Sequence, residues 1–409
     1  MSRLPLWPRR DFLRAMGALA LVDAAGAATP MPGTAASAMQ GTTAVQGDGA
    51  TITLFPAAGS QESLLSIDCA TETALFAPAI RDFQRLHPGV AVRCADRQSL
   101  DIHAQALARA QGRLRGAAPP LAPGEGGPDL LISSSLDLQT QLANDGHVLA
   151  HPSALARSLP AGAHWRHEVF SLGADAVVMV YHPRLLAPER APRTRGQLLA
   201  LLRYAGRPLA GRVGTYDASR SGLGYLLATQ DARHDSTAGV LLAALGANRV
   251  RLGDHIEPLL DELERGDLAL VYNVPASYVQ ARIAAGSPLR MLVPQDYTLL
   301  TTRAAVIPAT APHPELARPF LDYLLSRGGQ AVLARDTRLI PIRQAVAAGT
   351  GAGTGGDAGG GGFGSAQGLA GTATSSWRLL APGLGLLVYL DPLKRQRFLQ
   401  AWTTSMGAG

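Results

Sequence analysis

A short polar motif in the middle of the chain has the residue types of an anion-binding site. Ser219-Arg220-Ser221-Gly222 precedes a helix that is expected to begin near Leu223. The free N–H groups of a helix N-terminus, with an arginine and two hydroxyls beside them, suit a carboxylate or a phosphate. The motif lacks the Gly-Lys-Ser/Thr ending of a nucleotide-binding loop. The alternative is an ordinary capped helix with a solvated arginine. We take Ser219, Arg220 and Ser221 as candidate ligand-binding residues.

A serine run follows the strand predicted over 129–132. The hydroxyls of Ser133-Ser134-Ser135 and the helix N-terminus behind them are good donors to an anion. A plain N-cap is an equally good interpretation. Ligands of open α/β sheets bind beyond the carboxyl ends of the strands. Ser134 and Ser135 are therefore candidate site residues.

Other polar residues follow predicted strands or lie where the chain crosses between the two halves of the protein. Asp68 and Thr71 follow the strand predicted over 64–67, so we expect them to line the same site. Asp296 is a further candidate, where the chain should return from one half of the protein to the other. For its neighbour Tyr297 we favour packing at that return point.

A second cluster of candidates comes after the strand predicted over 268–272. It consists of Tyr272, Asn273, Ser277 and Tyr278. Phenol, amide and hydroxyl groups can bind a polar solute. The two tyrosines could instead be aromatic residues of the core or of the cleft wall, which is the commoner fate of tyrosine.

Motifs for catalysis and for metal binding are absent. His164, His167 and Glu168 do not match a metal-binding pattern, and we interpret them as solvated loop residues. No nucleophile elbow is present. We expect neither an enzyme, nor a bound metal, nor a cofactor.

The elements that must position these residues alternate between strand and helix. The apolar spacing predicts an α/β protein in which βαβ units build a doubly wound parallel sheet with right-handed crossovers. Strands are predicted over 64–67, 90–94, 129–132, 176–181, 211–214, 268–272 and 304–308, and helices over 75–86, 102–113, 138–144, 223–230 and 315–325.

Several segments resemble the periplasmic solute-binding proteins of ABC transporters. The helix, His87-Pro88-Gly89 turn and strand over 79–92 resemble the first helix and second strand of that family, and 127–135 resembles its third strand and ligand loop. The stretch 313–330 resembles its closing helix and is the most specific match. The closest subgroup is the iron(III)-type and phosphoglycerate-transport-regulatory-type binding proteins, which 216–225, 272–278 and 382–391 resemble.

The resemblance implies the type 2 periplasmic binding protein fold, with two α/β lobes that are joined by a hinge and close around a ligand. Residues 62–176 and 298–345 are expected to form lobe one, and residues 177–297 lobe two. The iron(III) binders of this subgroup use two adjacent tyrosines as ligands near 272–278. This chain has no adjacent pair there, which argues against ferric binding; Tyr272 and Tyr278 would be ligands only if that alternative held.

The N-terminal residues of the chain indicate export. Pro8-Arg9-Arg10-Asp11-Phe12-Leu13, a short apolar run and small residues up to Ala27 are typical of a twin-arginine signal peptide over 1–27. We expect a flexible leader over 28–60, a Gly-rich disordered insertion over 347–374 and a helical C-terminal segment over 376–405. The predicted location is the periplasm.

Charge and cysteine content add little about ligands. The formal net charge is +6, Lys394 is the only lysine, and no basic run is interleaved with aromatic residues. Nucleic-acid binding therefore has little support. Cys69 and Cys94 are the only cysteines; a disulfide and two free thiols are equally compatible with their spacing.

The sequence therefore predicts a monomeric periplasmic protein that captures a small anionic solute, a phosphorylated or carboxylated metabolite, for an ABC transporter permease. One alternative is a ferric-iron carrier of the same fold. Another is a sensor that presents its ligand to a membrane histidine kinase.

Overall fold

The computed structural model describes residues 43–47, 50–71, 73–114, 127–204, 209–349 and 376–407. The predicted signal peptide and residues 350–374 of the predicted Gly-rich insertion lie outside these ranges. Among the described residues, none of the helices has the length and apolar character needed to cross a membrane.

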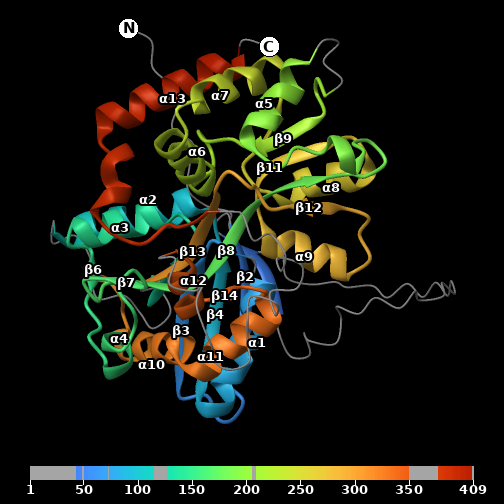
Figure 1. The fold of residues 1–409 in the computed structure, drawn as a ribbon. Coiled ribbons are helices and arrows are strands. Elements are labelled where there is room, and N and C mark those ends of the chain that lie inside the picture. The colour runs from blue at the N-terminus through green and yellow to red at the C-terminus, as the bar shows by residue number, and fades with distance from the viewer. Residues whose placement is uncertain are drawn as a thin grey trace, which may run out of the picture. The chain divides into compact units, whose positions relative to one another are not determined.

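The strands form one mixed sheet (Figure 1). Its order is β1-β2-β4-β3-β5-β13-β8-β11-β9-β10. Strands β3, β4 and β5 are parallel to one another, as are β9, β10 and β11, whereas the pairs β8–β13 and β8–β11 are antiparallel. The strands of this order are β1 Thr43–Gly47, β2 Ala50–Phe55, β3 Ser63–Cys69, β4 Val90–Asp96, β5 Leu130–Ser133, β8 Val169–Tyr181, β9 Val213–Tyr216, β10 Arg251–Gly253, β11 Leu270–Pro275 and β13 Thr298–Pro308. Further short strands pair with β8 or β13 outside this order, namely β6 Val148–Leu149, β7 His164–Trp165, β12 Arg290–Leu292, β14 Ile340–Pro341 and β15 Trp377–Leu379.

Two long strands connect the parallel groups. Every residue of β8 and of β13 is buried. Strand β8 pairs with β13 from Phe170 to Ala176 and with β11 from Val177 to Tyr181. The predicted boundary between the lobes at 176/177 remains a prediction, although β8 changes its partner there.

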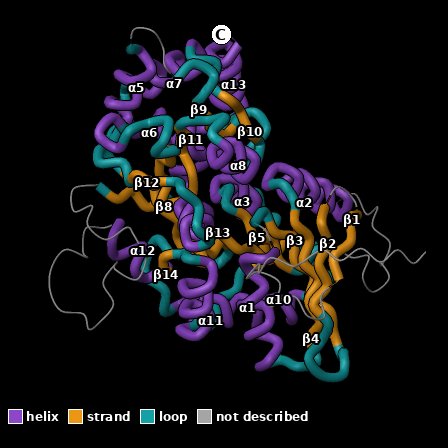
Figure 2. Tube along the Cα trace, turned by 90° about the vertical axis from the view of Figure 1, so that its right-hand side faces the viewer, coloured by secondary structure: helices purple, strands orange, loops and turns teal. Residues whose placement is uncertain are grey.

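Helices cover both faces of the lobe-one strands (Figure 2). The connections β3–α1–β4 and β4–α2–β5 run in opposite directions along the sheet, so right-handed crossovers place α1 and α2 on opposite faces. Helices α10 and α11 pack beside α1. The helices here are α1 Thr73–Leu86, α2 Ser99–Leu114, α3 Leu136–Asn144, α4 Ala154–Arg157, α10 Pro314–Leu325, α11 Arg327–Val332, the π-helical turn η3 Leu333–Thr337 and α12 Ile342–Gly349.

Lobe two has the same kind of chain path, with one helical connection outward along the sheet and one back past β9. Strand β9 leads outward to β10 through α6 and α7, and β10 leads back to β11 through α8. The C-terminal helix α13 packs on α7, where a Cβ on Gly246 would collide with the Ser405 carbonyl oxygen. The helices are the 3-10 turn η2 Pro188–Arg190, α5 Arg195–Arg203, α6 Gly222–His234, α7 Ala238–Ala247, α8 Glu257–Arg265, α9 Ala276–Ala284, the 3-10 turn η6 Leu384–Tyr389 and α13 Pro392–Gly407.

The prediction of a flexible leader over all of 28–60 was wrong for its second half. Strands β1 and β2 form an antiparallel hairpin, and β2 extends the sheet beside β4. The alternation along β2 buries Thr53 and Phe55 on one face and leaves Leu54 exposed on the other. The edge of β4 supplies the hydrogen-bond partners that β2 requires. Likewise, residues 347–349 of the predicted insertion are the last turn of α12.

Candidate functional site

A polar cavity lies between loops of the two lobes. Its volume is about 320 Å³. On the lobe-one side it is lined by Thr51, Cys69, Ala70, Thr71, Asp96, Arg97, Gln98, Ser99 and Ser134, and on the lobe-two side by Tyr216, Ser221, Leu223, Asp254, His255, Ile256, Glu257 and Tyr278. Gln98 and His255 contact each other through their side-chain nitrogens across this cavity, which we call the cleft.

Five helices direct their N-termini toward the cleft. Its lining residues stand just before or at the start of α1, α2, α3, α6 and α8, as Thr71, Ser99, Ser134, Ser221 and Glu257 show. These residues follow the carboxyl ends of parallel strands, where α/β sheets place their ligands. The N-terminal N–H groups and the helix dipoles create a positive potential there.

A buried arginine, Arg303, lies behind two residues of the cleft lining, Thr71 and Tyr278. Arg303 Nε donates to Thr71 Oγ1 at 3.0 Å, and Nη1 donates to Asp175 Oδ2 at 3.2 Å. The Arg303 guanidinium carbon lies 5.8 Å from the centroid of the Tyr278 ring. Burial by itself lowers the pKa of Arg303, but Tyr278 and Asp175 outweigh it and raise that pKa. Asp175 is on β8 and Arg303 on β13, so the two crossing strands hold this charge in place.

Four of the predicted site residues line the cleft, namely Thr71, Ser134, Ser221 and Tyr278. Ser221 also caps α6, since its hydroxyl accepts from the Gly224 N–H at 3.1 Å. Ser134 is half-buried and lies two residues before the start of α3, next to the N-cap residue Ser135.

The other lobe-one candidates are not in the lining. Asp68 is buried and forms an ion pair with Arg97 at 3.3 Å. Burial raises the pKa of Asp68, and the neighbouring Arg97 opposes that rise. Ser135 is fully buried, and its hydroxyl has no hydrogen-bond partner among the described residues. Ser133 is also buried and accepts from the Ser135 N–H.

The predicted anion-binding motif of lobe two is divided. Ser219 is exposed and donates to Asp217 at 2.6 Å. Arg220 is exposed and pairs with Asp254 at 3.0 Å. Of the motif's three candidates, only Ser221 reaches the cleft, because the turn from Asp217 into α6 leaves its two neighbours facing outward.

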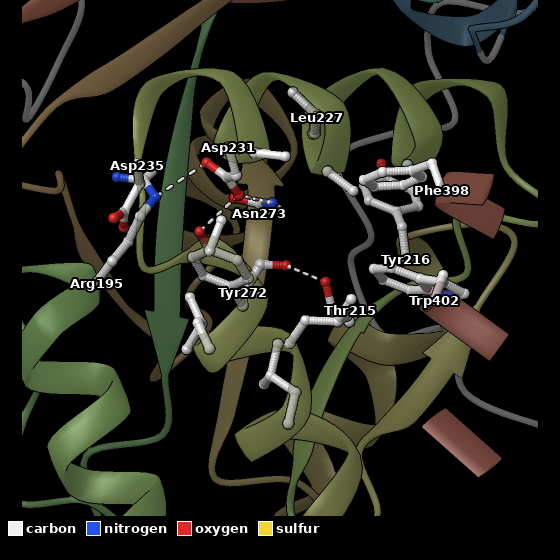
Figure 3. A pocket seen from close by; sticks show the side chains of 18 of the residues that line it. Arg195, Thr215, Tyr216, Leu227, Asp231, Asp235, Tyr272, Asn273, Phe398 and Trp402 are labelled. Atoms are coloured by element: carbon white, nitrogen blue, oxygen red, sulfur yellow. Dashed lines mark hydrogen bonds and ion pairs between the residues drawn. The ribbon is translucent and has the colours of Figure 1, made fainter. Parts of the chain in front are cut away.

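Tyr272 and Asn273 belong to a buried network inside lobe two. The carboxylate of Asp231 accepts from Arg195 Nε at 3.0 Å, Tyr272 OH at 2.8 Å, Asn273 Nδ2 at 3.0 Å and Tyr297 OH at 2.7 Å. Figure 3 shows the first three of these donors around Asp231. As predicted ligand residues, Tyr272 and Asn273 were expected to line the cleft. In the structure neither lines it, because both side chains point to Asp231.

The remaining candidates also serve internal contacts. Asp296 accepts from the backbone N–H of Arg195 at 2.9 Å and from its Nη1 at 3.2 Å. Ser277 donates to Asp175 from its backbone N–H and its hydroxyl. Burial raises the pKa of Tyr297 and of Tyr272 far above the ordinary range.

Sequence reasoning missed the loops after β4 and β10. Asp96 is the last residue of β4, and Arg97 and Gln98 follow it. Asp254 and His255 follow β10. The rule that ligands sit beyond strand ends could have found the first loop. The second was hidden because β10 is three residues long and its sequence does not alternate.

Metal-binding features are weak in the part of the chain that the structure describes. No group of three His, Cys, Asp or Glu side chains could hold a metal ion there. His164 and His167 stack with centroids 4.4 Å apart, away from the cleft lining. Cys69 and Cys94 are both buried and free.

Comparison with known proteins identifies the family. The family model described as bacterial extracellular solute-binding protein matches residues 65–336, which is more than half of the chain. The chain therefore belongs to the bacterial extracellular solute-binding proteins. No curated protein matches it.

Solved structures agree with this assignment. The chain is similar to the substrate-binding protein of an ABC transporter from Agrobacterium tumefaciens, with 28% identity, 87% of this chain and 98% of that chain covered and a TM-score of 0.74. AfuA from Actinobacillus pleuropneumoniae, with fructose-6-phosphate bound, is 15% identical over 85% of this chain and 100% of that chain, with a TM-score of 0.60. Iron-bound HitA from Pseudomonas aeruginosa is 15% identical over 84% and 99%, with a TM-score of 0.59. The expected fold of two α/β lobes in a type 2 periplasmic binding protein is confirmed.

Proposed function

We propose that this chain is an exported periplasmic protein that captures a small anionic solute in the cleft and delivers it to the permease of an ABC transporter. The observation that carries the proposal is the convergence of five helix N-termini on one polar cavity. The hydroxyls of Thr71, Ser99 and Ser134 stand at three of those N-termini. An anion gains hydrogen bonds and a favourable potential at such a place.

The charges of the lining favour a solute of low charge. Asp96 accepts from the Thr73 N–H at the start of α1, and Asp254 pairs with Arg220 outside the cavity. Arg97 is paired with Asp68, and Arg303 with Asp175. The carboxylate of Glu257 also lines the cleft. Since the lining holds three carboxylates, those of Asp96, Asp254 and Glu257, a singly charged carboxylated metabolite suits the cleft better than a doubly charged phosphate ester.

Closure of the lobes accompanies binding in this proposal. Gln98 and Gly222 already contact residues of the opposite lobe, so the cleft is closed along one side. A solute between the lobes would stabilise that closed form, and the permease would accept it. The signal sequence supports export by the twin-arginine route. No role as an enzyme is proposed.

The ferric alternative requires phenolate ligands. Tyr272 donates to Asp231 inside lobe two, so it is not available beside Tyr278. Tyr216 does line the cleft with Tyr278, but burial raises the pKa of Tyr216 well above its ordinary value. A ferric ion would have to overcome the free-energy cost of removing the proton from the buried Tyr216 phenol. A sensor role would share the cleft and differ in its membrane partner.

A calorimetric titration with carboxylated metabolites, phosphorylated metabolites and Fe³⁺–citrate tests the proposal. The expected ligand is a carboxylate. The Ser134→Ala variant should bind it about tenfold more weakly, because a hydrogen bond to a charged group contributes about 1.5–3 kcal/mol. The matched Ser219→Ala variant removes an exposed hydroxyl outside the lining and should bind normally. Binding of iron with a visible absorption band, or equal affinities for the two serine variants, would contradict the proposal.

A further inference from the structure

The acidic side chains of the cleft are distributed unevenly between its two walls. Asp254 and Glu257 line the lobe-two wall, whereas the described lobe-one lining has one carboxylate, that of Asp96. The lobe-one wall instead presents the N-termini of α1, α2 and α3. A solute that spans the cleft therefore meets partial positive charge on one side and negative charge on the other.

The N-termini of α2, α3 and α6 form the end of the cleft that suits a carboxylate. Ser99, Ser134 and Ser221 line the cleft there. These N-termini lie close together, since a Cβ on Gly222 would stand 3.1 Å from the Ser99 Cβ and 2.5 Å from the Oγ of Ser135. Their free N–H groups and the serine hydroxyls can donate to a carboxylate.

Glu257 is the lining carboxylate that lacks a partner. Asp254 pairs with Arg220 at 3.0 Å, and Asp96 accepts from the Thr73 N–H at 3.0 Å. Glu257 is half-buried, and none of the described residues makes a hydrogen bond or an ion pair with its carboxylate. A charge that is partly removed from water is costly without a counter-charge. Its carboxylate is therefore free to pair with a cation of the solute.

The arginine that approaches Glu257 is used by other carboxylates. Arg282 Nη2 donates to the backbone oxygen of Glu257 at 3.3 Å. Its Nη1 pairs with Asp261 at 2.6 Å and with Glu264 at 3.1 Å. Within the described ranges, Arg282 thus neutralises the outer part of α8 and leaves the charge at the cleft unbalanced.

The charge of Glu257 acts on the interior of the cleft. Burial, the neighbouring Tyr278 and the Glu257 carboxylate raise the pKa of Tyr216 well above its ordinary value. Tyr216 and Tyr278 both line the cleft beside Glu257. Aromatic rings attract cations, so these three side chains suit an ammonium group better than a second carboxylate.

We propose that the solute is an amino carboxylate, whose carboxylate is bound at the N-termini of α2, α3 and α6 and whose ammonium group pairs with Glu257. The inference rests on the proposed function and names the class of carboxylate that the cleft selects. The cleft volume of about 320 Å³ exceeds the roughly 150 Å³ that admits benzene, so a solute of about six to ten non-hydrogen atoms fits. Its two charges would contact both lobes and draw them together.

Three matched pairs of solutes test the requirement for an amino group. They are L-leucine with 4-methylpentanoate, L-glutamine with 4-carbamoylbutanoate, and 5-aminopentanoate with pentanoate. Calorimetric titration of the full mature protein at pH 7 should find an amino member that binds at least tenfold more tightly than its partner. If the amine-free member binds as tightly in every pair, the inference is overturned while the proposed carboxylate function stands. If no carboxylate binds, both fail.

Variants test whether the preference arises at Glu257. Glu257→Gln keeps the shape and removes the charge, so it should weaken the amino member at least tenfold and leave its partner unchanged. Glu257→Asp keeps the charge and should retain most of the preference. A carboxylate in the first turn of a helix also stabilises that helix. Glu315→Gln is therefore the control, because Glu315 stands in the first turn of α10 outside the cleft lining.

The control variant should bind both members as the unmodified protein does. If circular dichroism shows that Glu257→Gln is unfolded, Glu257→Met removes the charge at similar volume. A preference for the amino member that survives loss of the Glu257 charge, or equal weakening of both members, overturns the proposal.

Discussion

Gly222, at the start of α6 in lobe two, lies directly against Ser135, which precedes α3 in lobe one. A Cβ on Gly222 would stand 2.5 Å from Ser135 Oγ and 3.1 Å from Ser99 Cβ. Three helix N-termini therefore meet across the two lobes, and the absence of a side chain at Gly222 permits that approach. We therefore expect the proposed closed form of the cleft to depend on this contact.

Substitution of Gly222 should disfavour the closed form. The added methyl groups of Gly222→Val push the N-terminus of α6 away from α3, so we expect about tenfold weaker solute binding, equal to about 1.4 kcal/mol. Small-angle scattering of the unliganded variant should give a larger radius of gyration. Gly112→Val is the control, because a Cβ there meets nothing within 4 Å. Unchanged affinity and unchanged scattering for Gly222→Val would show that this contact does not control closure.

The Asp231 network should be critical for stability. Asp231→Ala removes the acceptor of four donors and leaves Arg195 buried with Asp296 as its remaining carboxylate. Breaking a buried pair costs about 3–5 kcal/mol, to be read from urea unfolding. Asp267→Ala removes a partner of the exposed Arg265 and serves as the control, with little expected change. A loss for Asp231→Ala no larger than that of the control would contradict the role of the network.

Asp137 should make stability fall as the pH rises. It is buried near the start of α3, and burial raises its pKa to about 7. Below pH 4 the carboxyl is protonated in both states, and its contribution to stability is complete. Between the unfolded pKa and about 7 the unfolded chain releases the proton while the folded chain retains it, so the free energy of unfolding falls by about 1.4 kcal/mol per pH unit. Above that range the loss is complete.

The comparison with Asp137→Asn isolates this effect. The amide cannot ionise, so the stability of the variant relative to the native chain should increase steadily from pH 5 to pH 7. Urea unfolding at pH 5, 6 and 7 measures the difference. Asp101→Asn, at an exposed position of α2, should follow the native pH dependence. Parallel curves for Asp137→Asn and the native chain would refute the assignment.

The two cysteines should be unreactive in the folded protein. Both thiols are buried and free, and burial raises the pKa of Cys69 well above its ordinary value. The thiolate is the reactive form, so iodoacetamide at pH 8 should label neither residue in native conditions. In denaturant without reductant, mass spectrometry should find two labels per chain. An unlabelled denatured chain would instead reveal a disulfide between Cys69 and Cys94.

Part of the fold could be predicted because apolar periodicity reports burial directly. Helix α1 and strands β3 and β4 lie where the spacing places them, within a few residues. Strand β8 was predicted over 176–181 but begins at Val169. Its first half contains Ser171, Gly173 and Asp175, which look like a loop in the sequence. They are buried because β13 and β14 flank this segment and supply polar partners.

The sequence by itself determined the class of protein, the alternating elements and the loops at strand ends, because these follow from local spacing and from helix-capping residues. Only the tertiary structure decided which polar residues reach the cleft. The bulge in β11 and the positive φ of Asn273, +62°, turn Tyr272 and Asn273 toward Asp231. That choice depends on the carboxylate of Asp231, about forty residues earlier in the chain on helix α6. No local pattern encodes such a contact, because its energy arises only when both elements are packed together.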